Sequence, residues 1–151
     1  MNNELKLLEI LLVEDNKGDV ELIQEALEDG KLHVKLHVAS DGVEAMKFLR
    51  AEERYKDAPC PDLVLLDLNL PRKSGSQVLE EIKTDPKLKS IPVVILTSSK
   101  ADEDICRSYN MHANCYITKP VNFDQFIKVV KSIEDFWFTV VKLPCRDLPG
   151  R

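Results

Sequence analysis

Long apolar runs and an excess of basic residues are both missing from this sequence. No stretch approaches the roughly 20 apolar residues that a membrane-spanning helix needs, and the first residues lack the features of a signal peptide. Lys and Arg number 21 against 26 Asp and Glu, so the electrostatic attraction that nucleic-acid binding requires is weak. We therefore expect a cytoplasmic protein that binds neither membranes nor nucleic acid.

Cysteine and histidine are scarce and scattered. The four cysteines include no Cys-x-x-Cys pair, and none of the three histidines stands at a spacing that would complete a zinc site. We therefore expect reduced, unpaired thiols and no structural zinc. His33 and His37 are four residues apart, but in a segment that is typical of a strand, where that spacing does not favour a shared metal.

The chain is nevertheless well suited to folding. Its 151 residues fit a single ordinary domain, and 44% hydrophobic with 31% charged residues is typical of a packed core under a solvated surface. Short apolar runs alternate with segments of helical periodicity. We predict strands at residues 7–13, 33–38, 62–67, 91–97 and 115–118, and helices at 17–28, 41–53, 77–83, 102–111 and 123–138.

This alternation predicts an α/β fold with a parallel sheet and helices on both faces. Ser40 or Asp41 is expected to cap the second helix, residues 54–61 to form a surface loop, and Pro71 and Gly75 to bracket another loop. Right-handed crossovers make an open doubly wound sheet the natural topology, and ligands bind such sheets outside the carboxyl ends of the strands. Those ends are where a functional site is expected.

Polar side chains follow four of the predicted strands. Glu14 and Asp15 come after the first strand, Asp67 ends the third, Thr97 ends the fourth and Lys119 follows the fifth. Each has an ordinary structural explanation, since acids form turns, threonine favours strands and lysine is common on surfaces. Together they form a coherent group at one edge of the sheet.

Clustered carboxylates repel one another unless a cation lies between them, and hard oxygen ligands with room for water suit Mg²⁺. A carboxylate can also accept a phosphoryl group as a covalent intermediate. A metal ion, an ammonium group and a hydroxyl then balance the phosphoryl charge. Asp67 is best placed to be the acceptor, because it ends a central strand.

Four motifs in this order resemble one known family. The motifs are Glu14-Asp15, DLNLP at 67–71 with Gly75, Thr97-Ser98 and YITKP at 116–120. They resemble the receiver domain of two-component response regulators over about residues 5–138. The resemblance implies a flavodoxin-like sheet of five strands, ordered 2-1-3-4-5, with five helices.

The resemblance also implies roles for individual residues. Asp67 would become an aspartyl-phosphate by transfer from a histidine kinase, with Lys119 and Thr97 contacting the phosphoryl group. The metal site would draw on Glu14, Asp15, Asp67 and the backbone carbonyl of Asn69. Tyr116 would change rotamer with Thr97 as a switch, although packing in the strand also explains it, and the bond before Pro120 would be cis.

The end of the chain departs from a plain receiver. Residues 139–151 are too few for an output domain, so we expect a short C-terminal extension and a protein that acts by contact. The sequence HANCYITKP at 112–120, the loop at 54–61 and this extension look like the small response regulators of cyanobacterial phytochromes. Most receivers have Gly-Ala where this chain has His112-Ala113, and an acid at the position of Ser74.

Phe136, Trp137 and Phe138 offer more apolar surface than a short segment buries on itself. They either pack on the chain's own core or form a partner surface. The family resemblance favours a homodimer through the fourth helix, fifth strand and fifth helix.

Two other functions remain open. A phosphatase of the haloacid-dehalogenase type also uses a strand-end aspartate, but it needs a second carboxylate where this chain has Asn69, so turnover of outside substrates is not expected. A docking module with an idle pocket would be expected to lose at least one pocket residue, and here every one is present.

Overall fold

The computed structural model describes residues 7–29, 34–97, 115–118, 124, 126–128 and 131, leaving out the side chains of 29, 115, 116 and 118. A parallel sheet forms its centre, with the strand order β2-β1-β3-β4-β5. The strands are β1 (Leu8–Val13), β2 (Val34–Ala39), β3 (Leu63–Asp67), β4 (Val93–Thr97) and β5 (Cys115–Thr118). The predicted order of the first four strands is confirmed.

The register of the sheet follows from its apolar strands. β1 lies between β2 and β3, and Ile10 pairs with Leu36 on one side and Leu63 on the other. The residues of β3 and β4 are buried throughout, as expected for parallel strands covered on both faces. The helix predicted at 102–111 lies outside the described residues, and so does most of the helix predicted at 123–138.

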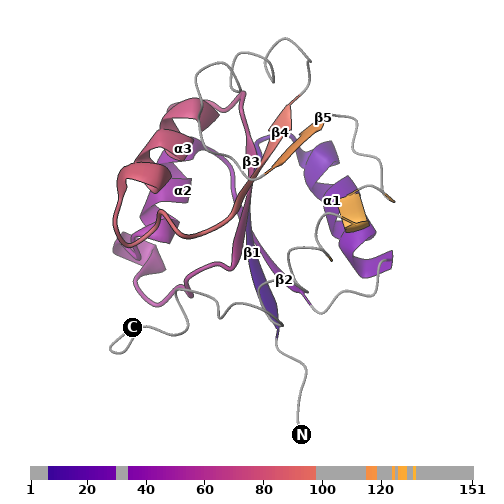
Figure 1. Cartoon of the computed structure of the whole chain (residues 1–151), viewed down its shortest axis with the longest axis horizontal. Helices are drawn as coiled ribbons and strands as arrows, with labels where there is room; N and C mark the ends of the chain where they lie inside the picture. Colours follow the sequence, from indigo (N-terminus) through magenta and orange to yellow (C-terminus); the bar gives the residue numbers. More distant parts are fainter. Residues whose placement is uncertain are drawn as a thin grey trace, which may run out of the picture.

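Helices cover both faces of the sheet. α1 (Lys17–Asp29) lies on one face, and α2 (Gly42–Leu49) and α3 (Gly75–Thr84) lie together on the other (Figure 1). Each face has its own apolar core: Ile23 and Phe126 are buried on the α1 side, and Phe48 and Leu79 on the α2–α3 side. This coverage leaves the carboxyl ends of the strands as the place where polar side chains meet.

Two helix boundaries differ from the predictions by at least two residues. α2 ends at Leu49 rather than near Glu53, because Ala51 has φ 55° and the left-handed backbone stops the helix before a short 3-10 turn, η1 (Glu53–Tyr55). α3 begins at Gly75, not at residue 77, because a capping box between Ser74 and Gln77 starts the helix there.

One expectation from composition is wrong. Cys60 is disulfide-bonded, so the expectation of reduced, unpaired thiols is wrong at this position, which sequence spacing alone did not indicate. In the part of the chain that the structure describes, no helix has the length and apolar character to cross a membrane.

Candidate functional site

Three carboxylates meet at the carboxyl ends of two neighbouring strands. Glu14 and Asp15 directly follow β1, and Asp67 is the last residue of β3. The register pairs Val13 with Leu66, so the acids after each strand arrive at the same edge. One carboxylate oxygen from each residue lies within 4.8 Å of the others. The structure thus brings together the three acids that the sequence predicted would converge.

The acids differ in their exposure to water. Glu14 is 1% and Asp67 4% exposed, whereas Asp15 is exposed. The backbone N–H of Asn16 donates to Glu14 Oε2 at 3.2 Å, which orients that carboxylate. Three carboxylates so close together favour a bound cation, and hard oxygen donors of this kind suit a divalent metal such as Mg²⁺ or Mn²⁺. The donor set therefore fits a metal site.

Asp67 is held by the loop that follows it. The backbone N–H of Asn69 donates to Asp67 Oδ1 at 3.0 Å, and the N–H of Leu68 donates to the carbonyl of Leu96 at 3.2 Å. The chain then folds back closely, since a Cβ atom on Gly75 would lie 2.2 Å from the carbonyl oxygen of Asp67. Gly75 thus lets the start of α3 approach the acceptor's backbone.

Thr97 lies on the strand next to Asp67. It ends β4 and is fully buried. Asp67 pairs in register with Leu96, the residue that precedes Thr97 in the chain. Thr97 itself pairs with Thr118, the residue before Lys119. The register thus aligns the end of β5 with the end of β4 at this edge of the sheet.

Several predicted residues lie outside the described part of the chain. Tyr116 belongs to β5, but its side chain is not described. Neither the backbone nor the side chain is described for Lys119, Pro120, Phe136, Trp137 and Phe138. Asn69 is exposed and adjoins the acids through Asp67, as described above.

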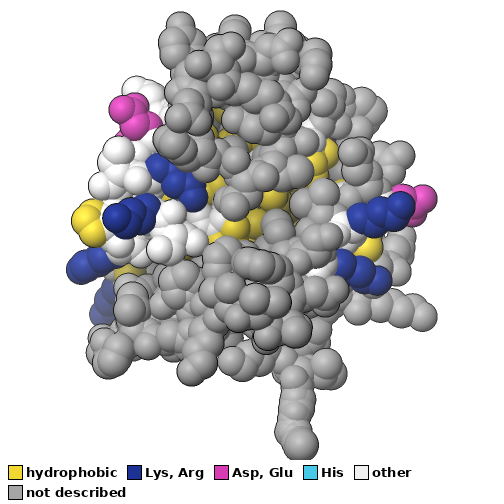
Figure 2. Space-filling view, viewed as in Figure 1, with side chains coloured by type: hydrophobic (Ala, Val, Ile, Leu, Met, Phe, Trp, Pro, Cys, Tyr) yellow, Lys and Arg dark blue, Asp and Glu magenta, His cyan; other side chains and the backbone are white. Residues whose placement is uncertain are grey.

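Sequence reasoning missed one feature beside the site. Asp41 was predicted only as a possible helix cap, yet Arg72, in the loop between β3 and α3, donates from Nη1 to Asp41 Oδ2 at 3.1 Å. Figure 2 shows basic side chains over the α2–α3 layer on the face in view. No local pattern marks this pair, because its members are 31 positions apart in the sequence.

Comparison with known proteins gives a consistent result. The response regulator receiver domain family matches residues 10–131. Response regulator Rcp1 of Synechocystis sp. is 49% identical over 135 residues, which cover 89% of this chain and 92% of Rcp1.

Two solved structures are similar in both sequence and fold. The phosphorylated cyanobacterial phytochrome response regulator RcpA is 52% identical with a TM-score of 0.76, covering 92% of this chain and 99% of that one. The Mn²⁺-bound form of Rcp1 is 48% identical with a TM-score of 0.74, covering 90% and 98% respectively. The chain therefore belongs to the response regulator receiver family, whose members bind a divalent metal and are phosphorylated by histidine kinases.

Proposed function

We propose that this protein accepts a phosphoryl group on Asp67 from the phosphohistidine of a sensor kinase, with Mg²⁺ as the cation, and then changes its partner contacts. The gathering of Glu14, Asp15 and Asp67 within 4.8 Å at one edge of the sheet carries this proposal. The membership of the receiver family supports it.

The transfer is a substitution at phosphorus. A carboxylate oxygen of Asp67 forms the new P–O bond while the P–N bond to the kinase imidazole breaks, and the departing nitrogen takes up a proton. The groups that would hold a divalent cation are Glu14, Asp15, Asp67 and the Asn69 carbonyl, and the cation would supply positive charge for the phosphoryl oxygens.

The remaining residues of the site have supporting roles in this proposal. The Lys119 ammonium pairs with the phosphoryl group, and the Thr97 hydroxyl donates a hydrogen bond to one of its oxygens. Tyr116 changes rotamer with Thr97, and the bond before Pro120 is cis. The added charge of about −2 is the signal that shifts the protein between two states.

The test is mass spectrometry after incubation with acetyl phosphate and Mg²⁺. We expect a single phosphoryl adduct on the wild type and none on Asp67→Asn. Asp62→Asn is the matched control, because Asp62 is also buried but precedes β3, at the opposite end of that strand. An adduct that persists in Asp67→Asn, or is absent from the wild type, contradicts the proposal.

We propose that the protein is not an enzyme for outside substrates. Asn69 stands where a haloacid-dehalogenase phosphatase has its general acid, so each adduct should form and decay once per cycle. Steady release of phosphate from a phosphomonoester would contradict this. A docking module with an idle pocket would form no adduct at all in the first test.

The proposed phosphoryl donor is a phytochrome with histidine kinase activity. The similarity to RcpA, a cyanobacterial phytochrome response regulator, supports this choice. A cyanobacterial phytochrome kinase should phosphorylate the protein much faster than a chemoreceptor-coupled kinase does at equal concentration. Equal rates from the two kinases would remove the phytochrome assignment.

The complete proposed architecture has a receiver of five strands and five helices at residues 5–138, followed by a C-terminal extension at 139–151. We place it in the cytoplasm, free of membrane and nucleic acid. It forms a homodimer through the fourth helix, the fifth strand, the fifth helix and Phe136, Trp137 and Phe138. Sedimentation at micromolar concentration that shows only monomers, with and without a phosphoryl mimic, would contradict the dimer.

A further inference from the structure

The loop at 68–74, which links Asp67 to α3, is fastened to the start of α2. Arg72 donates from Nη1 to Asp41 Oδ2 at 3.1 Å, while Asp41 Oδ1 accepts the backbone N–H of Glu44 at 2.8 Å. Asp41 is 7% exposed, so little water competes for its carboxylate. One buried carboxylate therefore serves both as the cap of α2 and as the partner of Arg72.

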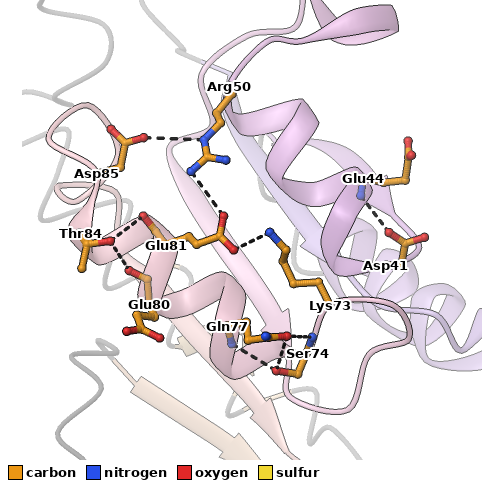
Figure 3. A network of polar contacts seen from close by, with 10 residues as sticks. All are labelled: Asp41, Glu44, Arg50, Lys73, Ser74, Gln77, Glu80, Glu81, Thr84 and Asp85. Atoms are coloured by element: carbon orange, nitrogen blue, oxygen red, sulfur yellow. Dashed lines mark hydrogen bonds and ion pairs between the residues drawn. The ribbon is translucent and has the colours of Figure 1, made fainter.

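The backbone of the same loop packs against α2. A Cβ atom on Gly42 would lie 2.1 Å from the carbonyl oxygen of Lys73, so only glycine allows this approach. The Lys73 side chain pairs with Glu81 of α3, and Glu81 pairs in turn with Arg50 at the end of α2 (Figure 3). The loop is thus held by both helices of this layer.

Arg72 holds a backbone conformation that a free chain would avoid. Its φ of 66° is left-handed, which costs a residue other than glycine about 1 kcal/mol or more. The N–H of Lys73 donates to the carbonyl of Pro71 at 2.7 Å and closes a tight turn there. Such a conformation persists when its surroundings enforce it, and the contacts with Asp41 and Gly42 do so.

Arg72, one member of the ion pair, lies close to the acceptor Asp67 along the chain. Asn69 is separated from Arg72 by Leu70 and Pro71 only, and the proline ring fixes φ at its position. A displacement of Arg72 would therefore be transmitted to Asn69, whose N–H orients Asp67 Oδ1 at 3.0 Å.

We propose that Asp41 and Arg72 are positioning residues of the acceptor site: their ion pair fixes the loop so that Asn69 and Asp67 are placed for the cation before it binds. This inference rests on the proposed function. It adds a pair of residues that touch neither cation nor phosphoryl group and act through the loop backbone. The competing explanation is that the pair only stabilises α2.

Asp41→Asn separates the two explanations, because asparagine is as good a helix cap as aspartate but leaves Arg72 without its carboxylate. Arg72→Ala removes the other partner. Substitution of a residue that orients a metal ligand through a hydrogen bond typically weakens metal binding about 10- to 100-fold. Because Arg72 is half exposed and acts indirectly, we expect Kd for Mg²⁺ by calorimetry to rise about 3- to 10-fold in each variant.

The double variant shows whether the two residues act as a pair. If they do, Asp41→Asn combined with Arg72→Ala weakens Mg²⁺ binding no more than either change alone. Arg54→Ala is the matched control, since Arg54 is an exposed arginine that pairs with Glu44 of α2 rather than with Asp41. Its Kd should stay within about twofold of wild type.

A second measurement needs neither metal nor phosphorylation. Amide hydrogen exchange at 68–74 in metal-free buffer should speed up about 3- to 10-fold in Asp41→Asn and Arg72→Ala, but not in Arg54→Ala. Wild-type exchange and Mg²⁺ affinity in both loop variants would overturn the inference. A wild type that forms no adduct on Asp67 would overturn the proposed function instead, while the two measurements here would still decide the role of the pair.

Discussion

Acidic side chains are arranged in opposite ways in two regions of this molecule. In the α2–α3 layer, acids alternate with cations: Arg50 lies 3.4 Å from Glu81 and 3.9 Å from Asp85, and Lys73 pairs with Glu81 (Figure 3). At the carboxyl edge of the sheet, Glu14, Asp15 and Asp67 lie within 4.8 Å of one another.

The difference separates residues that maintain the fold from residues that are prepared for a ligand. Exposed ion pairs add little stability each, but as a network they fix how α2, α3 and the 68–74 loop lie. Clustered carboxylates oppose folding through mutual repulsion, and a cation that binds them reverses that effect. The stability that the α2–α3 ion pairs contribute should therefore depend on monovalent salt. The stability at the acid cluster should depend on divalent metal.

Divalent metal should produce the largest difference between the regions. At a Mg²⁺ concentration 100 times its Kd, binding to the folded state alone should raise the free energy of unfolding by about 2.7 kcal/mol. Urea unfolding of the wild type with and without Mg²⁺, at matched ionic strength, measures this. Asp67→Ala should lose most of the gain, whereas Glu81→Ala should keep it. Equal gains in both variants would contradict a metal site at the acid cluster.

Removing a negative charge should raise the free energy of unfolding at the acid cluster, but should leave it unchanged or lower it in the α2–α3 layer. Asp67→Asn keeps the shape and the Oδ1 acceptor for Asn69, but it removes one of three repelling charges. We expect it to raise the free energy of unfolding in metal-free buffer by about 1 kcal/mol. Asp85→Asn, which removes a charge that faces Arg50, should be neutral or destabilising. Denaturant unfolding that shows a loss of stability in Asp67→Asn would contradict this interpretation.

The sequence predicted the acid cluster well because the physics that creates it is simple. Alternating apolar strands and helical segments determine a parallel sheet, and in such a sheet β1, β3 and β4 must end at one edge. Glu14, Asp15, Asp67 and Thr97 could therefore be grouped from their positions after the strands. That grouping needed no side-chain detail.

The α2–α3 layer could not be predicted in the same way. The pairing of Arg72 with Asp41 depends on how two loops from different strands meet, and the end of α2 depends on a left-handed backbone at Ala51, a residue with no preference for it. The disulfide of Cys60 likewise depends on tertiary proximity. Spacing along the sequence carries none of this information.

Breaking the centre of the α2–α3 network should have a smaller effect than either change at the acid cluster. Arg50→Ala removes a guanidinium whose side chain is 39% exposed and which contacts two acids. We expect a loss of about 0.5 kcal/mol that largely disappears in concentrated NaCl, because salt screens surface pairs. Urea unfolding at low and high NaCl measures it. A loss that is equal at both salt concentrations would assign the role of Arg50 to packing.

The smallest expected effect concerns a cation of this layer whose hydrogen bonds go to carbonyl groups. Lys83 Nζ donates to the carbonyls of Lys89 at 3.2 Å and Ile91 at 2.9 Å, and burial lowers its pKa below the usual 10.5. Between the lowered pKa and 10.5 the unfolded chain binds more protons at this group, so its contribution to stability rises with pH.

Lys83→Met should therefore remove a small rise in stability toward alkaline pH. The side chain is only partly buried, so we expect the difference between wild type and variant to change by about 0.5 kcal/mol or less across that window. Arg50→Ala is a suitable control, since arginine does not titrate there. Urea midpoints measured from pH 8 to 10.5 give the comparison. A difference that shrinks as pH rises would mean that the charged form of Lys83 stabilises the fold, and that its two hydrogen bonds outweigh the cost of burial.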